Sequence, residues 1–384
     1  MPASEAERST ELALILALAR EADDAALAAS APRVDFGRMA DELARLRVLA
    51  LLGGRVLERA DVVSPPDSFR ERVEACVEAS RSDALLQQML TWRLLQGLAA
   101  DGVQAMPLKG PYLAERLHGD PALRSSADID LLVRARDLPS AIGSLERLGY
   151  ARPRRSEQLP RLHHIFEAQG APPVELHWRV SWYETRYADE AIDRSSLAHG
   201  IRVPAPADEL VLLLLMYARD GLAGMRFPLD VAAWYRRHGP GALVAVDPML
   251  RRHGALQRPV LAAALAVDRL LGLDLGARIG PRQQPPAGTV AALRLQDWAQ
   301  LLGPQDADVA VKIVDGLLTQ PRGQPGWLAR VVLPRLPPSS RPAAIDQALY
   351  VLHFVGRATP IYTRLLSGSS VVALVGEPLR QHAR

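Results

Sequence analysis

Residues 127–133 read ADIDLLV, and the predicted fold rests on this stretch. Asp128 and Asp130 alternate with the apolar residues Ile129 and Leu131, which is the period-two pattern of a β-strand with one buried face. Both carboxylates therefore project from the same side of the strand. Because neighbouring carboxylates repel each other, the pattern predicts a cation between them. Magnesium (Mg2+), which binds carboxylate oxygens, waters and phosphate oxygens, fits this arrangement.

A third acid follows in residues 174–178, VELHW, where Glu175 stands between apolar residues of another predicted strand. An unpaired glutamate is costly to bury, so this position also indicates a cation. If this strand lies beside the strand of Asp128 and Asp130, three carboxylates meet in one site. Three acids suffice for two metal ions that clamp the attacking and leaving oxygens of a phosphoryl transfer. His177 would share the face of Glu175 and is interpreted as a hydrogen-bonded core residue.

Basic residues lie upstream of the aspartates. Residues 103–108 are predicted as a short strand, and Lys109 and Gly110 form the turn into a helix. Free backbone amides and the positive end of that helix favour phosphate, and Lys109 adds a point charge. Arg124 can reach a triphosphate as a planar cation with several donors. For Lys109 and Arg124, a salt bridge to the aspartates is the alternative interpretation.

Strands and helices alternate through the middle of the chain, which predicts an α/β or α+β core. Helical periodicity precedes this core from about Ser9 to Ala100 and returns beyond Pro206. Proline-rich breaks divide the later helices. The predicted core elements are strands at residues 103–108, 128–133, 165–168 and 174–180, and helices through Leu113 and Leu117 and at residues 138–148.

Taken together, these motifs resemble those of a known protein family. The chain is similar to the uncharacterised bacterial nucleotidyltransferase family of the polymerase β-type superfold, over roughly residues 85 to 240. The residues that carry the resemblance are LKG at 108–110, Leu117, Arg124, DIDLLV at 128–133, LGY at 148–150 and VELHW at 174–178.

The resemblance implies an α+β fold, with a small mixed sheet and flanking helices. We expect an N-terminal helical region at residues 1–100, a nucleotidyltransferase core at 101–200 and a C-terminal helical domain at 201–384. It also implies transfer of a nucleoside monophosphate from a nucleoside triphosphate, such as ATP, to an acceptor hydroxyl. Mg2+, or Mn2+ in its place, would be the cofactor. The acceptor is a small molecule, a peptide or a protein.

Each candidate residue receives a role from this resemblance. Asp128 and Asp130 would bind the metal ions and orient the α-phosphate, and Glu175 would complete the second ion's shell or serve as the base. These three acids are the predicted catalytic and metal-binding residues. The predicted phosphate-binding residues are Lys109, Gly110 and Arg124.

One departure from the superfold supports a second interpretation. Pro111 follows the glycine turn, where proline offers no amide to phosphate. The same fold could therefore bind a nucleotide or a partner without turnover, with the helical regions as a docking surface. RNA binding through arginine-rich loops such as RPRR at 152–155 is a third interpretation. Nucleic acid is not the expected partner, because aromatics make up 5% of residues and no basic stripe stands out.

Composition excludes several other classes of protein. The single Cys76 cannot form an intramolecular disulfide, and no apolar run approaches the roughly 20 residues that cross a bilayer. We expect a cytoplasmic protein without a membrane span. No phosphate-binding P-loop, nucleophile elbow or zinc-type Cys/His spacing is present. His163 and His164 are adjacent, so in a strand they face opposite sides and cannot easily share one ion.

Overall fold

A four-stranded mixed sheet lies at the centre of the computed structural model. β2 and β4 run parallel, whereas β1 and β3 are antiparallel to their neighbours. The predicted α+β fold with a small mixed sheet is therefore confirmed. The strands, in spatial order, are β1 (Ala105–Pro107), β2 (Ile129–Val133), β4 (Val174–His177) and β3 (His163–Phe166). The structure describes residues 5–153, 162–181, 184, 186–280, 293, 304–318, 348, 351–352, 354–355 and 358, without the side chains of 5–9 and 304–310.

The register between β2 and β4 places the two acidic stretches side by side. Asp130 stands opposite Glu175, and Leu131 stands opposite Leu176. Because side chains alternate along each strand, both acids lie on one face and both leucines on the other. The condition for a three-carboxylate site, that these strands adjoin, is thus fulfilled.

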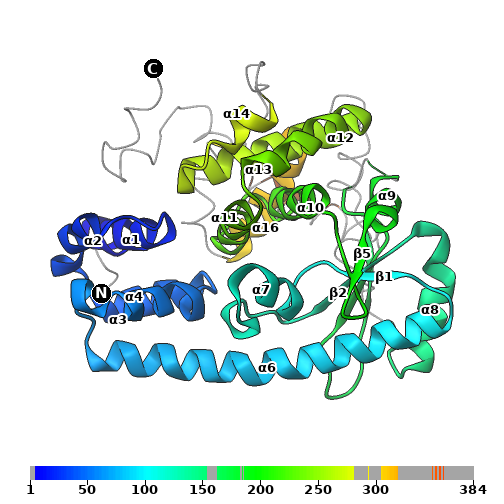
Figure 1. The fold of residues 1–384 in the computed structure, drawn as a ribbon, viewed down its shortest axis with the longest axis horizontal. Coiled ribbons are helices and arrows are strands. Elements are labelled where there is room, and N and C mark those ends of the chain that lie inside the picture. The colour runs from blue at the N-terminus through cyan, green and yellow to red at the C-terminus, as the bar shows by residue number, and fades with distance from the viewer. Residues whose placement is uncertain are drawn as a thin grey trace.

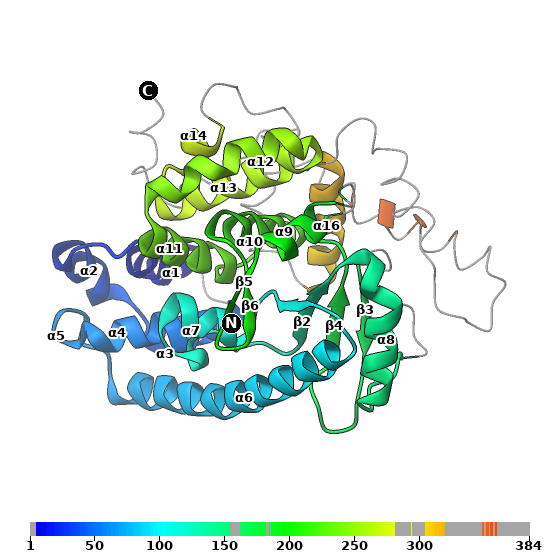
Figure 2. The same cartoon turned by 45° about the vertical axis from the view of Figure 1, so that its right-hand side comes forward.

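The two faces of the sheet have different coverings. The apolar face packs on the long helix α6 (Asp67–Ala100) and on α8 (Leu138–Arg147), which lie below and beside the sheet in Figure 2. The acidic face looks toward α9 (Tyr187–Arg194) and α10 (Pro206–Arg219). The apolar face and its covering helices contribute Leu94, Leu98, Ile129, Leu131, Ala141, Leu145, Phe166, Val174 and Leu176 to one core.

Helix α6 connects two parts of the molecule (Figure 1). Its buried residues recur at helical spacing, with Phe69 and Val73 near its start and Leu94 and Leu98 near its end. The first pair packs among the N-terminal helices, and the second lies under the sheet. One helix therefore fixes the position of the sheet relative to the N-terminal region.

The N-terminal and C-terminal helices share one apolar core. Leu14 and Leu43 belong to the same buried cluster as Leu210 and Trp234, and Arg20 donates a hydrogen bond to the Leu270 carbonyl at 2.7 Å. The predicted boundaries at residues 100 and 200 stay predictions. The N-terminal helices are α1 (Glu5–Ala19), α2 (Asp24–Ser30), α3 (Phe36–Arg45), α4 (Gly54–Glu58) and α5 (Ala60–Val63). The C-terminal helices after α10 are α11 (Arg226–His238), α12 (Val246–Arg252), α13 (Gln257–Leu271), α14 (Leu275–Ile279) and α16 (Pro304–Leu318).

Several local predictions differ from the structure. A short hairpin of β5 (Ser196–Ala198) and β6 (Ile201–Val203) was not predicted. Helix α10 begins at Pro206, and the buried Asp208 in its first turn pairs with Arg194. The proline-rich stretches at 281–286, 321–325 and 334–342, and residues 154–155 of the RPRR loop, lie outside the described residues. Among the described helices, none has both the length and the apolar character needed to cross a membrane.

The packing beneath the sheet predicts an asymmetry along α6. Leu98 is fully buried, whereas Leu85 on the same helix is 54% exposed. Leu98→Ala should lower the free energy of unfolding by about 2–5 kcal/mol, because it leaves a cavity in the core. Leu85→Ala, the matched control, should stay within about 0.5 kcal/mol of wild type. Urea unfolding followed by circular dichroism measures both, and equal effects would contradict this packing.

Candidate active site

Lys109 lies between Asp128, which precedes β2, and Asp130 within it. Its Nζ is 3.4 Å from Asp128 Oδ2 and 3.0 Å from Asp130 Oδ2. The turn that places Lys109 there requires Gly110, whose φ of 84° favours glycine. The alternative interpretation of Lys109, a salt bridge to the aspartates, is therefore what the structure contains. The predicted metal ion between the two aspartates stays a prediction.

The three predicted acids come together. Asp128, Asp130 and Glu175 each offer one carboxylate oxygen, and these oxygens all lie within 4.8 Å of one another. The Asp130 side chain is fully buried, whereas those of Asp128 and Glu175 are 25% and 21% exposed. The cluster thus has a closed inner side and an outer side that solvent reaches.

The donor set of this cluster suits a hard divalent ion. All three candidate ligands are carboxylate oxygens, which Mg2+ prefers. Asp130 Oδ2 is buried and accepts no hydrogen bond from the described residues, although the Lys109 ammonium lies against it. Three acids face one lysine, so the site has negative charge left for an ion to neutralise.

The pKa values of the acids follow from burial and these neighbours. Burial and the charge of Asp130 raise the pKa of Asp128. Burial alone would raise the pKa of Asp130 too, but the charge of Lys109 and the hydrogen bond from His177 hold it well below its usual value. For Glu175, burial is likewise outweighed by the hydrogen bond from His177, which lowers the pKa. Asp130 and Glu175 are therefore ionised at neutral pH.

His177 links two of the acids, as its interpretation as a hydrogen-bonded core residue predicts. Its Nε2 donates to Asp130 Oδ1 at 3.1 Å and lies 3.3 Å from Glu175 Oε2. His163 packs edge-on against this ring, with the centroids 4.7 Å apart. His164 lies on the opposite face of the sheet, where it packs on Trp178. The two adjacent histidines thus face opposite sides, as predicted.

The position of His163 within the site is not apparent from the sequence. It stands opposite His177 in the antiparallel pairing of β3 with β4, and its Nδ1 lies 3.6 Å from Glu175 Oε2. Burial and the charge of His177 lower the pKa of His163 to about 3, so its ring is neutral. Ser126 was also not singled out, although its hydroxyl donates to Asp128 Oδ1 at 3.0 Å and orients that carboxylate.

Arg124 is buried beside the site, in contact with a different acid. Its Nε donates to Asp230 Oδ2 at 2.7 Å, and His118 Nε2 lies 3.0 Å from Asp230 Oδ1. Nη1 and Nη2 of Arg124 are buried without a hydrogen-bond acceptor among the described residues. Asp230 lies inside α11 and is not a helix cap. A phosphate-binding role of Arg124 stays a prediction.

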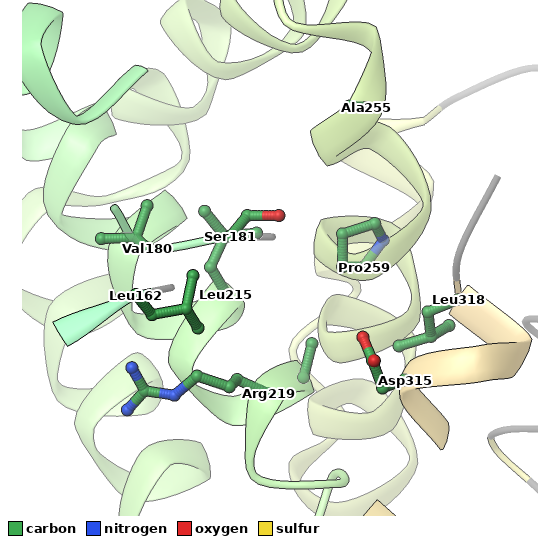
Figure 3. Close-up of a pocket in the computed structure, with 10 residues that line it drawn as sticks. Leu162, Val180, Ser181, Leu215, Arg219, Ala255, Pro259, Asp315 and Leu318 are labelled. Carbon is green, nitrogen blue, oxygen red and sulfur yellow. The ribbon is translucent and has the colours of Figure 1, made fainter. Parts of the chain in front are cut away.

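A pocket lies between α10, α13 and α16, and Arg219 of α10 lines it (Figure 3). Nε and Nη1 of Arg219 are buried and find no hydrogen-bond acceptor among the described residues, although Nε lies 3.5 Å from Asp220 Oδ1. The charge of Arg219 helps to lower the pKa of Asp130, although the effects of burial, Lys109 and His177 on this pKa are larger. The position of this arginine is not apparent from the sequence. The pocket is also lined by Leu162, Val180, Leu215, Pro259 and Asp315.

The comparisons with known proteins give one finding. The model of a protein family described as an uncharacterised nucleotidyltransferase matches residues 32–272. This range contains the sheet, the acidic cluster and the first helices after it. Neither the curated proteins nor the solved structures provide a match.

The buried ion pair of Arg124 and Asp230 predicts a large effect on stability. Asp230→Asn should lower the free energy of unfolding by about 3–5 kcal/mol, because it leaves the buried guanidinium without a negative partner. The control Asp247→Asn removes a more exposed carboxylate that pairs with Arg251, and should cost less than about 1 kcal/mol. Chemical unfolding of the two variants compares these values. A similar small loss in both would show that the pair does not stabilise the fold.

Proposed function

Since the chain belongs to the family of uncharacterised nucleotidyltransferases, we propose that it transfers a nucleoside monophosphate from a nucleoside triphosphate to an acceptor hydroxyl. Pyrophosphate is the leaving group. The observation that carries this proposal is the convergence of Asp128, Asp130 and Glu175 within 4.8 Å, next to Lys109. The acceptor is a small molecule, a peptide or a protein.

Asp128, Asp130 and Glu175 hold Mg2+, or Mn2+ in its place. The bound ion supplies positive charge to the phosphate oxygens and to the acceptor oxygen. Asp130 is fixed by His177 and Asp128 by Ser126, so both carboxylates are oriented before substrate arrives. The lowered pKa of Glu175 makes it a weak base, so its ionised and partly exposed carboxylate is better suited to complete the ion's ligand shell.

Lys109 has two successive partners in this proposal. Without substrate, its ammonium neutralises Asp128 and Asp130. When the metal and the triphosphate bind, Lys109 turns to the phosphates, which carry the larger negative charge. The start of α7 (Pro111–His118) supports this binding. Pro111 occupies the first helical position, where a helix leaves the amide unpaired in any case, so the amides of Tyr112 and Leu113 are still available.

Arg219 and Arg124 are the further candidates for phosphate binding. Both are cations with buried guanidinium nitrogens that lack an acceptor among the described residues. A phosphate offers several oxygens to such a planar donor group. Arg219 also lines a pocket, and its charge acts on Asp130 of the acidic cluster.

The salt bridges of Lys109 also favour a second function. Asp128 and Asp130 are already neutralised in part by this lysine, so the chain could bind a nucleotide or a partner without turnover. The two functions differ in product. A transferase releases pyrophosphate, whereas a binding module holds the nucleotide unchanged.

Calorimetry with each nucleoside triphosphate in Mg2+ tests the site. Wild type should bind at least one of them in a metal-dependent manner, and combining Asp128→Asn with Asp130→Asn should weaken binding at least about 100-fold. Release of pyrophosphate should fall to the same extent. The control Asp83→Asn changes an exposed acid on α6 and should bind as wild type does. Unchanged binding by the double variant would refute the site, and binding without pyrophosphate release would favour the second function.

Replacing Lys109 separates its two roles. Lys109→Met should strengthen Mg2+ binding in the absence of nucleotide about tenfold, because the ammonium no longer competes for the two carboxylates. The same variant should bind the triphosphate about tenfold more weakly. Titrations with Mg2+ alone and with nucleotide measure both effects. Arg136→Met, which removes a cation that is 74% exposed, serves as the control. Weaker Mg2+ binding by Lys109→Met would contradict this role.

A further inference from the structure

A second set of candidate ligands adjoins the acidic cluster on its inner side. His163, Glu175 and His177 each offer one ligand atom, and these atoms lie within 4.8 Å of one another. The two histidines are 3% and 0% exposed. Glu175 belongs to both sets, so it lies between a position with only oxygen ligands and a position with two nitrogen ligands.

Several ring nitrogens of this cluster are without hydrogen bonds. Among the described residues, neither nitrogen of His163 has a hydrogen-bond partner, nor does Nδ1 of His177. Buried polar atoms are normally paired, since an unpaired one costs about 1–3 kcal/mol. A histidine that serves only as packing material would be expected to make at least one hydrogen bond. His163 instead directs Nδ1 toward the Glu175 carboxylate at 3.6 Å, which is beyond hydrogen-bond distance.

The distances from Glu175 to the two histidines match those between ligands of a tetrahedral ion. Zinc binds histidine nitrogen and carboxylate oxygen at about 2.0–2.2 Å, so two such ligands in a tetrahedron lie about 3.3–3.6 Å apart. Glu175 Oε2 is 3.3 Å from His177 Nε2 and 3.6 Å from His163 Nδ1. An ion at the centre would replace the single proton that His177 Nε2 now directs at the carboxylates.

We propose that His163, Glu175 and His177 bind a Zn2+ ion, at a position distinct from the one that Asp128 and Asp130 form. Imidazole nitrogens select zinc and similar transition metals, whereas Mg2+ takes oxygen ligands. Three protein ligands leave a fourth position for water or a substrate oxygen. The binding of this ion does not depend on nucleotide transfer.

Co2+ tests the site directly, because a four-coordinate Co2+ ion absorbs visible light and takes the ligands of zinc. The full chain, without a histidine tag or nucleotide, is titrated with Co2+. Wild type should bind Co2+ with this absorption, and Zn2+ should abolish it whereas excess Mg2+ should not. His163→Gln should weaken binding at least about 100-fold. The matched control is His164→Gln, the adjacent histidine on the opposite face, which should bind as wild type does.

Other variants separate this site from the proposed transferase. Asp128→Asn should lose binding of Mg2+ and nucleotide but retain the Co2+ absorption, because Asp128 is not among the three ligands. Equal Co2+ affinity in His163→Gln and His164→Gln, or no Co2+ binding by wild type, would overturn the zinc site and leave the nucleotide site intact. If His163→Gln fails to fold, X-ray absorption of the zinc-loaded wild type counts its imidazole ligands. Two are expected, and fewer would refute the assignment.

Discussion

The site depends on one constraint, the burial of the Asp130 carboxylate in the middle of the sheet. A charge without solvent must be compensated by charges and hydrogen bonds close to it. Lys109 supplies the charge from the turn after β1, and His177 supplies a hydrogen bond from β4. The need to compensate the buried charge of Asp130 explains why a lysine lies in the turn after one neighbouring strand and a histidine ends the other. The parallel pairing of β2 with β4 then brings Glu175 to the same position.

The rest of the fold gives this polar face a firm support. The opposite face of the sheet is apolar and is covered by α6 and α8, so apolar packing supports the strands on that side. Ion pairs connect the front of the core to the C-terminal helices. Arg116 of α7 pairs with Glu209 of α10, and Arg124 pairs with Asp230 of α11. The site is therefore a polar layer between two apolar ones.

Sequence alone predicts the parts of the site that depend on local pattern. The alternation in ADIDLLV and VELHW gives the strands and the shared face of their acids, because side chains of a strand alternate by geometry. The pairing of β3 with β4 is not a local property, so the place of His163 beside Glu175 could not be deduced. Arg124 and Asp230 are 106 residues apart in the chain, and their contact depends on how α11 packs. Arg219 is the last residue of α10, an apolar helix whose sequence indicates only core.

The shared core of the N-terminal and C-terminal helices has a consequence for biosynthesis. Leu14 and Leu43 pack in one cluster with Leu210 and Trp234. Because synthesis proceeds from the N-terminus, the first helices leave the ribosome before the helices that they pack against exist. Contacts between distant parts of a chain form slowly, and the waiting segments expose apolar surface. The apolar faces of the early helices therefore lack their partners until α10 and α11 are synthesised, so the N-terminal region completes its core late.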